Sequence, residues 1–109
     1  MDALLDTGSD DTVFPERVAA AIGVDLSNAP VGEASVVGLA GIRVRYAQVK
    51  LRISDGREQR EWTGWVGFTA SPLKQPLLGF AGFLQFFGSH FHGDQEVVEL
   101  TVNRLYPGT

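Results

Sequence analysis

Glycine and other turn-forming residues divide this chain into short apolar runs, and this punctuation limits the folds that it can adopt. The 109 residues include 13 Gly and 5 Pro. Short runs in which apolar and polar residues alternate between such breaks are typical of β-strands joined by turns. Apolar residues make up 44% of the chain, which is enough for one packed core. We therefore expect a single all-β domain over residues 1–109, with one or two short helices.

Local signals place the expected elements. Pro15, an acidic residue beside it and Gly23 at the end predict a short helix, with Val18 and Ile22 facing the core. The apolar phase slips near Ala47, which predicts a bulge or a crossing in a long strand. A second helical turn is expected over residues 81–87. Strands are expected at residues 3–5, 34–37, 42–46, 49–53, 61–68, 77–78, 90–92 and 96–102.

The composition excludes several classes of protein. Without cysteine there is no disulfide framework, no cysteine-ligated zinc site and no thiol nucleophile. A net charge of −4 makes nucleic acid an unexpected partner. No apolar stretch has the length of a membrane span and no signal peptide is visible, so we expect no membrane contact and favour a cytoplasmic location. The most informative residues lie within the first fifteen, which is typical of a fragment of a longer chain.

The sharpest chemical signal is Asp6-Thr7-Gly8-Ser9, directly after the apolar run at residues 3–5. A carboxylate at the end of a buried strand, beside glycine and small hydroxyl residues, can be held rigidly among backbone donors. Taken alone, Asp-Thr-Gly more often only closes an Asx-type turn. The surrounding sequence therefore has to decide between a structural turn and a reactive loop.

The segment ALLDTGSDDTV at residues 3–13 resembles the active-site segment of the retropepsins, the retroviral-type aspartic proteases. Further landmarks follow in the family's order. The Gly-rich hairpin VVGLAG at residues 36–41 is similar to the flap, and Leu77-Leu78-Gly79 is similar to the segment that crosses behind the catalytic loop. The helix expected at residues 15–23 is similar to one in bacterial members. The resemblance covers about residues 3–102 and implies a retropepsin-like acid protease fold.

The resemblance implies an aspartic endopeptidase that cleaves peptide or protein substrates as a homodimer, with no metal or other cofactor. Two carboxylates must share one water, and this chain has a single Asp-Thr-Gly, so the second carboxylate comes from Asp6 of another subunit. Asp55 and Asp94 lie in polar turns without a following Thr-Gly. Asp6 is then catalytic, with Ser9 donating to its carboxylate, and Thr7, Gly8 and Ser9 complete the active-site loop. Substrate contacts are implied at Asp10, Asp11, Gly38, Leu39, Ala40, Gly41, Leu73 and Leu77.

The chain also departs from the family pattern. Few residues precede Asp6, and Phe80 stands where many members have the Arg that pairs with the residue matching Asp10. The longer C-terminal segment, residues 88–102, is expected to form a hairpin that pairs across the dimer. Two alternatives remain: a non-catalytic dimerisation or peptide-binding module of the same fold, and an unrelated small β-barrel binder in which Asp-Thr-Gly is a turn.

Other clusters are expected to be structural. His90-Phe91-His92 superficially resembles a metal motif, since alternate strand residues share a face. The chain has no further imidazole or thiolate, so exposed strand histidines and no metal site are expected. Six basic residues alternate with apolar ones and are expected on a solvated sheet face: Arg43, Arg45, Lys50, Arg52, Arg57 and Arg60. Four aromatic residues are expected in the core or at an interface: Phe80, Phe83, Phe86 and Phe87.

Overall fold

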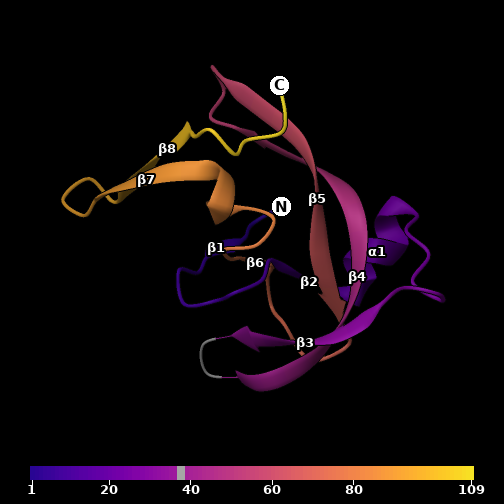
Figure 1. Cartoon of the computed structure of the whole chain (residues 1–109). Helices are drawn as coiled ribbons and strands as arrows, with labels where there is room; N and C mark the ends of the chain where they lie inside the picture. The colour runs from indigo at the N-terminus through magenta and orange to yellow at the C-terminus, as the bar shows by residue number, and fades with distance from the viewer. Residues whose placement is uncertain (37–38) are drawn as a thin grey trace.

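The computed structural model describes residues 1–36 and 39–109, and strands dominate it, so the expected all-β class is confirmed (Figure 1). A six-stranded sheet has the order β1-β6-β2-β5-β4-β3, and β7 and β8 form a separate two-stranded sheet. The helical elements are α1, Glu16–Ile22, and one 3-10 turn, η1, Leu84–Phe86. The strands are β1 Leu4–Leu5, β2 Val13–Pro15, β3 Val31–Val36, β4 Leu39–Ser54, β5 Gln59–Thr69, β6 Leu77–Leu78, β7 Phe87–His92 and β8 Val97–Val102.

Helix α1 forms where proline and glycine predict it. Pro15 is the N-cap residue, and Gly23 ends the helix with a φ of 78°, a left-handed conformation that favours glycine. Ala19 is buried, and Val18 packs against the same cluster. Ile22 was expected to face the core but is 56% exposed, so that prediction is wrong. The helix ends at this residue, and residues of the following loop supply the apolar contacts instead.

Strands β4 and β5 form a long antiparallel hairpin without the predicted bulge. Their register is unbroken from the pair Arg45–Phe68 to the pair Ser54–Gln59. The apolar phase changes because the two ends of β4 bury opposite faces. Val44 packs in a cluster with residues of β2 and β6, whereas Val49 packs with residues of α1 and β5. Of the two predicted explanations, the bulge is therefore wrong, and the crossing of the buried side from one face of the ribbon to the other is confirmed.

Of the six basic residues expected on a solvated sheet face, five are exposed and Arg60 is partly buried. Lys50 and Arg52 both contact Glu61, at 3.3 and 3.4 Å. Such exposed pairs contribute little to stability but keep both charges paired across the strands. In the part of the chain that the structure describes, no helix is long and apolar enough to cross a membrane.

An aromatic cluster packs the base of the β7–β8 hairpin against β5. Trp62 of β5 lies edge-on to Phe83, Phe87 and Tyr106, with ring centroids 5.4–5.9 Å apart. Its indole N–H donates to the carbonyl of Gly82 at 3.0 Å. Trp62, Phe83 and Phe87 are buried, and rings of this size each remove a large apolar area from water. The expected helical turn at residues 81–87 is reduced to η1, because Gly82 has a φ of 89° and cannot belong to a helix.

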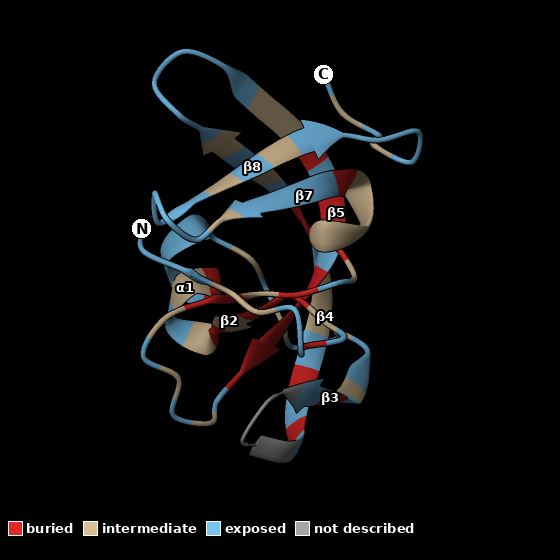
Figure 2. Ribbon diagram, turned by 90° about the vertical axis from the view of Figure 1, so that its left-hand side faces the viewer, coloured by how far each residue is buried: buried red, intermediate tan, exposed pale blue. Residues whose placement is uncertain are grey.

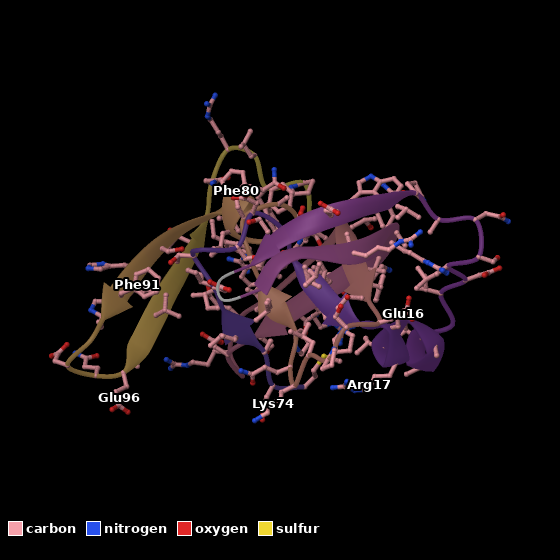
Figure 3. All side chains as sticks on the ribbon, turned by 90° about the horizontal axis from the view of Figure 1, so that it is seen from below. Glu16, Arg17, Lys74, Phe80, Phe91 and Glu96 are labelled. Atoms are coloured by element: carbon pink, nitrogen blue, oxygen red, sulfur yellow. The ribbon has the colours of Figure 1, made fainter. Side chains whose placement is uncertain are left out.

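Beyond this cluster the hairpin projects from the sheet (Figure 1) and most of it is exposed (Figure 2). Phe91 is 58% exposed and Val97 is 52% exposed. Phe91 and Glu96 mark this end of the molecule in Figure 3, and Glu16 of α1 lies toward the opposite end. The final hairpin predicted from the sequence is thus confirmed.

Candidate active site

The Asp6 loop joins β1 to β2, and strand β6 lies between these two strands. Leu4 and Leu5 pair in parallel with Leu77 and Leu78, while Val13 pairs with Leu77 in the antiparallel sense. Residues 6–12 therefore pass over the end of β6. The segment Leu77-Leu78-Gly79 lies behind the loop, which is the position that the resemblance led us to expect.

Backbone hydrogen bonds hold the loop against the segment after β6. The amide of Asp6 donates to Leu78 O at 3.0 Å, before the loop turns. After the turn, the amide of Phe80 donates to Ser9 O at 3.0 Å and that of Ala81 to Asp10 O at 2.9 Å. Both sides of the loop are therefore tied to one strand and its extension, and these bonds hold the backbone from which the Asp6 side chain projects.

Gly79 makes this close approach possible. A Cβ atom at this position would lie 2.1 Å from the carbonyl oxygen of Asp11 and 2.7 Å from that of Ser9. Both neighbours are backbone atoms and cannot swing away as a side chain would. The glycine of the Leu-Leu-Gly segment is therefore required by packing against the loop.

The Asp6 side chain is partly buried and has a main-chain donor. The amide of Gly8 donates to Asp6 Oδ1 at 3.0 Å. The Ser9 hydroxyl is buried and donates its only proton to the Asp11 carbonyl at 2.7 Å. The prediction that Ser9 supports the Asp6 carboxylate is therefore wrong, and Gly8 has that role. Thr7 and Gly8 are exposed, which leaves the outer side of the loop open to another molecule.

Tyr46 of β4 also belongs to this region, although it is not among the site residues expected from the sequence. Its hydroxyl donates to Asp11 Oδ2 at 3.3 Å. Its ring lies over Gly32, where a Cβ atom would come within 2.7 Å of a ring carbon. Tyr46 follows Ile42 and Val44 in alternation, so the pattern predicts only an apolar strand position there. The hydroxyl at an otherwise apolar position was the available signal.

Burial raises the pKa of Tyr46, and the nearby Asp11 charge and hydrogen bond raise it further. The folded-state pKa then exceeds the unfolded value of about 10. The stability that the Tyr46 hydroxyl contributes is complete below that value and is lost as the pH rises through the folded pKa.

We expect the free energy of unfolding to fall more steeply above a pH of about 10 in the wild type than in Tyr46→Phe. Urea unfolding of both proteins across this range is the measurement; parallel curves would contradict the assignment.

The other residues predicted to contact substrate differ in how far they are exposed. Asp10 is exposed, and its amide reaches Ser35 O of β3 at 3.5 Å. Leu73 is partly buried, whereas Leu77 is only 7% exposed and offers little surface to a ligand.

The predicted flap tip is only partly described. Gly38 lies outside the described residues, and the backbone of Leu39 and Ala40 begins β4. Gly41 is exposed and has a φ of 59°. The structure thus describes only one part of the predicted flap, namely the antiparallel pairing of β3 with β4 on either side of the tip.

Neither of the other turn carboxylates considered from the sequence joins the Asp6 loop. Asp55 closes the β4–β5 turn, where its Oδ1 accepts the amides of Arg57 and Glu58 at 2.8 and 2.7 Å. These hydrogen bonds, first that from Glu58, lower the pKa of Asp55. Asp94 lies in the exposed turn between β7 and β8. Neither Asp55 nor Asp94 therefore supplies a second carboxylate to the Asp6 loop.

Comparison of the chain with protein-family models, curated proteins and solved structures gives no match in any of the three. The Asp6 loop presents one carboxylate, held by a backbone amide, beside an exposed threonine and glycine. Such an arrangement can accept a proton from water or donate one to a carbonyl oxygen.

Proposed function

We propose that this chain is an aspartic endopeptidase with a retropepsin-like fold and that it acts as a homodimer. One observation carries the proposal: the Asp6-Thr7-Gly8 loop spans β6 and is tied to the Leu77-Leu78-Gly79 segment by backbone hydrogen bonds. An ordinary Asx turn needs no strand between its two arms and no glycine behind it. The observed arrangement is what a rigidly held catalytic carboxylate needs.

The proposed reaction uses one Asp6 from each subunit. One carboxylate takes a proton from the bound water, and the protonated partner donates to the oxygen of the scissile carbonyl. The amide of Gly8 keeps each carboxylate oriented through its bond to Oδ1. The exposed Thr7 is available to link the two loops across the dimer. Asp11, whose carboxylate accepts a hydrogen bond from Tyr46, is the proposed substrate contact on the same loop.

The β7–β8 hairpin is the proposed dimer contact. Within the described residues this sheet has only two strands, so each has one edge free of a strand partner. Free edges beside exposed apolar side chains favour pairing with another chain, and a two-fold axis would pair each hairpin with its copy. Truncation at Ser89 would not isolate this contact, because it also removes Leu100 and Tyr106 from the cluster around Trp62.

Phe91→Glu is a more selective test of the hairpin contact. The side chain is 58% exposed, so the folded chain should tolerate the change, while a charge at a buried interface should weaken association at least about tenfold. Trp65→Glu is the matched control, since Trp65 is 53% exposed on β5. Analytical ultracentrifugation measures both. Equal dimer affinity in the wild type and Phe91→Glu would place the interface elsewhere.

A peptide-library assay tests the activity itself. The purified chain is incubated with a mixed peptide library between about pH 4 and 7, and new termini are identified by mass spectrometry. The proposal expects cleavage with a bell-shaped pH profile, because one carboxylate must be protonated and the other ionised. Peptide binding without any cleavage would favour the non-catalytic module of the same fold.

A further inference from the structure

The β7–β8 hairpin brings together three side chains with metal-binding chemistry. His90 and His92 are alternate residues of β7 and share one face of the hairpin. The strand register places Glu99 of β8 directly opposite His90. The register is needed to see this, because Glu99 lies seven positions after His92 in the sequence and the chain has no other histidine.

The distances suit a shared ligand. The two imidazole rings have centroids 4.3 Å apart, and His92 Nε2 lies 3.3 Å from Glu99 Oε1. One ligand atom from each of the three side chains can be chosen so that all lie within 4.8 Å of one another. Ligand atoms bound to one zinc ion each lie about 2.0–2.2 Å from it. His90 and Glu99 are exposed, so their side chains are free to rotate. Small rotations would bring all three ligand atoms to this distance from one ion.

The rest of the hairpin leaves this face open. Pairing places Phe87, Phe91, Val98 and Leu100 on the opposite face, where Phe87 and Leu100 belong to the cluster around Trp62. The histidine face is therefore turned away from the aromatic core. An ion bound there would keep a coordination position for water or for a further ligand, as three-ligand zinc sites do.

We propose that His90, His92 and Glu99 form a binding site for a divalent transition-metal ion of the zinc class. Two imidazoles and one carboxylate suit Zn²⁺ better than Mg²⁺ or Ca²⁺, which prefer all-oxygen ligand sets. The site lies on the two-stranded sheet and uses no residue of the Asp6 loop, so it does not rest on the proposed peptidase activity. Bound metal links β7 to β8 and stabilises the hairpin whose exposed edges are the proposed dimer contact.

Zinc titration of the full chain without an affinity tag tests the proposal. Isothermal titration calorimetry with ZnCl₂ at pH 7.5 should give one ion per chain. His90→Ala, His92→Ala and Glu99→Gln should each weaken binding by about tenfold or more, since even outer-shell changes cost 10- to 100-fold. Glu58→Gln, which makes the same charge change on the exposed β4–β5 turn, should bind like the wild type.

Two further readouts separate this site from other carboxylates and from loss of structure. In NMR spectra Zn²⁺ should shift the imidazole signals of both histidines, and circular dichroism should show that each variant is folded. If one histidine variant does not fold, the other and Glu99→Gln still decide the question. Binding that survives His90→Ala but is lost in Asp11→Asn would overturn the proposal. The absence of binding at about 1 mM Zn²⁺ would also overturn it, because even a weak site with a Kd of about 1 mM would be half occupied at that concentration.

Discussion

Asp6→Asn should reduce peptide hydrolysis by at least about a thousandfold while the chain stays folded and dimeric. The amide is nearly isosteric with the carboxylate and can still accept the hydrogen bond that Gly8 donates to Asp6 Oδ1. It cannot take a proton from water, so the loss falls on the transition state, at about 1.4 kcal/mol for each tenfold decrease in rate. Initial rates on the best library peptide, with matched circular dichroism and sedimentation data, measure the effect.

Asp2→Asn is the control for this experiment. It makes the same chemical change four residues earlier, at an exposed side chain outside the loop. We expect its rate to stay within about twofold of the wild type, because surface substitutions of this kind rarely change more than a few tenths of a kcal/mol. Activity of Asp6→Asn above about one per cent of wild type, with contaminating protease excluded, would refute the catalytic role of Asp6.

Gly79→Ala should strongly destabilise the folded chain. The new Cβ would lie 2.1 Å from Asp11 O and 2.7 Å from Ser9 O, so the loop and β6 must move apart. Overpacking of this kind costs about 1–3 kcal/mol, and more where the obstructing atoms are backbone. Separation would also stretch the hydrogen bonds that tie Phe80 and Ala81 to the loop. We therefore expect activity to fall together with stability.

Gly93→Ala provides a matched comparison. Gly93 lies in the β7–β8 turn, and a Cβ there would meet nothing within 4 Å. Its unfolding midpoint in urea should stay near that of the wild type, whereas that of Gly79→Ala should fall clearly. Coincident unfolding curves for all three proteins would mean that the loop does not press on residue 79, and the proposed rigid support of Asp6 would lose its basis.

The features predicted correctly from the sequence are those set by neighbouring residues. Pro15 and Gly23 predict the limits of α1, because each favours the backbone φ that a helix start or end requires. Asp55 and Gly56 predict the β4–β5 turn, because Asp55 accepts local amide hydrogen bonds and Gly56 has a positive φ. The Leu77-Leu78-Gly79 segment was expected behind the loop only by resemblance. The pairing of β6 between β1 and β2 agrees with that expectation.

The features that the sequence could not predict depend on contacts between distant residues. The phase slip in β4 indicates either a bulge or a crossing, and the sequence does not decide between them because the buried face is set by contacts with α1 on one side and with β6 on the other. The Ser9 hydroxyl had several acceptors within reach, and only the folded loop shows that it donates to Asp11 O. Tyr46 and Glu99 join their respective clusters through strand register, which local sequence does not specify.

A subunit-mixing experiment tests the central claim most directly, namely that one catalytic site needs Asp6 from two chains. Wild-type chain and Asp6→Asn are mixed in varying proportion at a fixed total concentration and allowed to exchange subunits before the rate is measured. If both carboxylates are required, only dimers of two wild-type chains are active, and an equal mixture retains about one quarter of the wild-type rate by mass action. A rate near one half at equal mixing, with exchange verified by mass spectrometry, would show that each chain acts alone and would contradict the account.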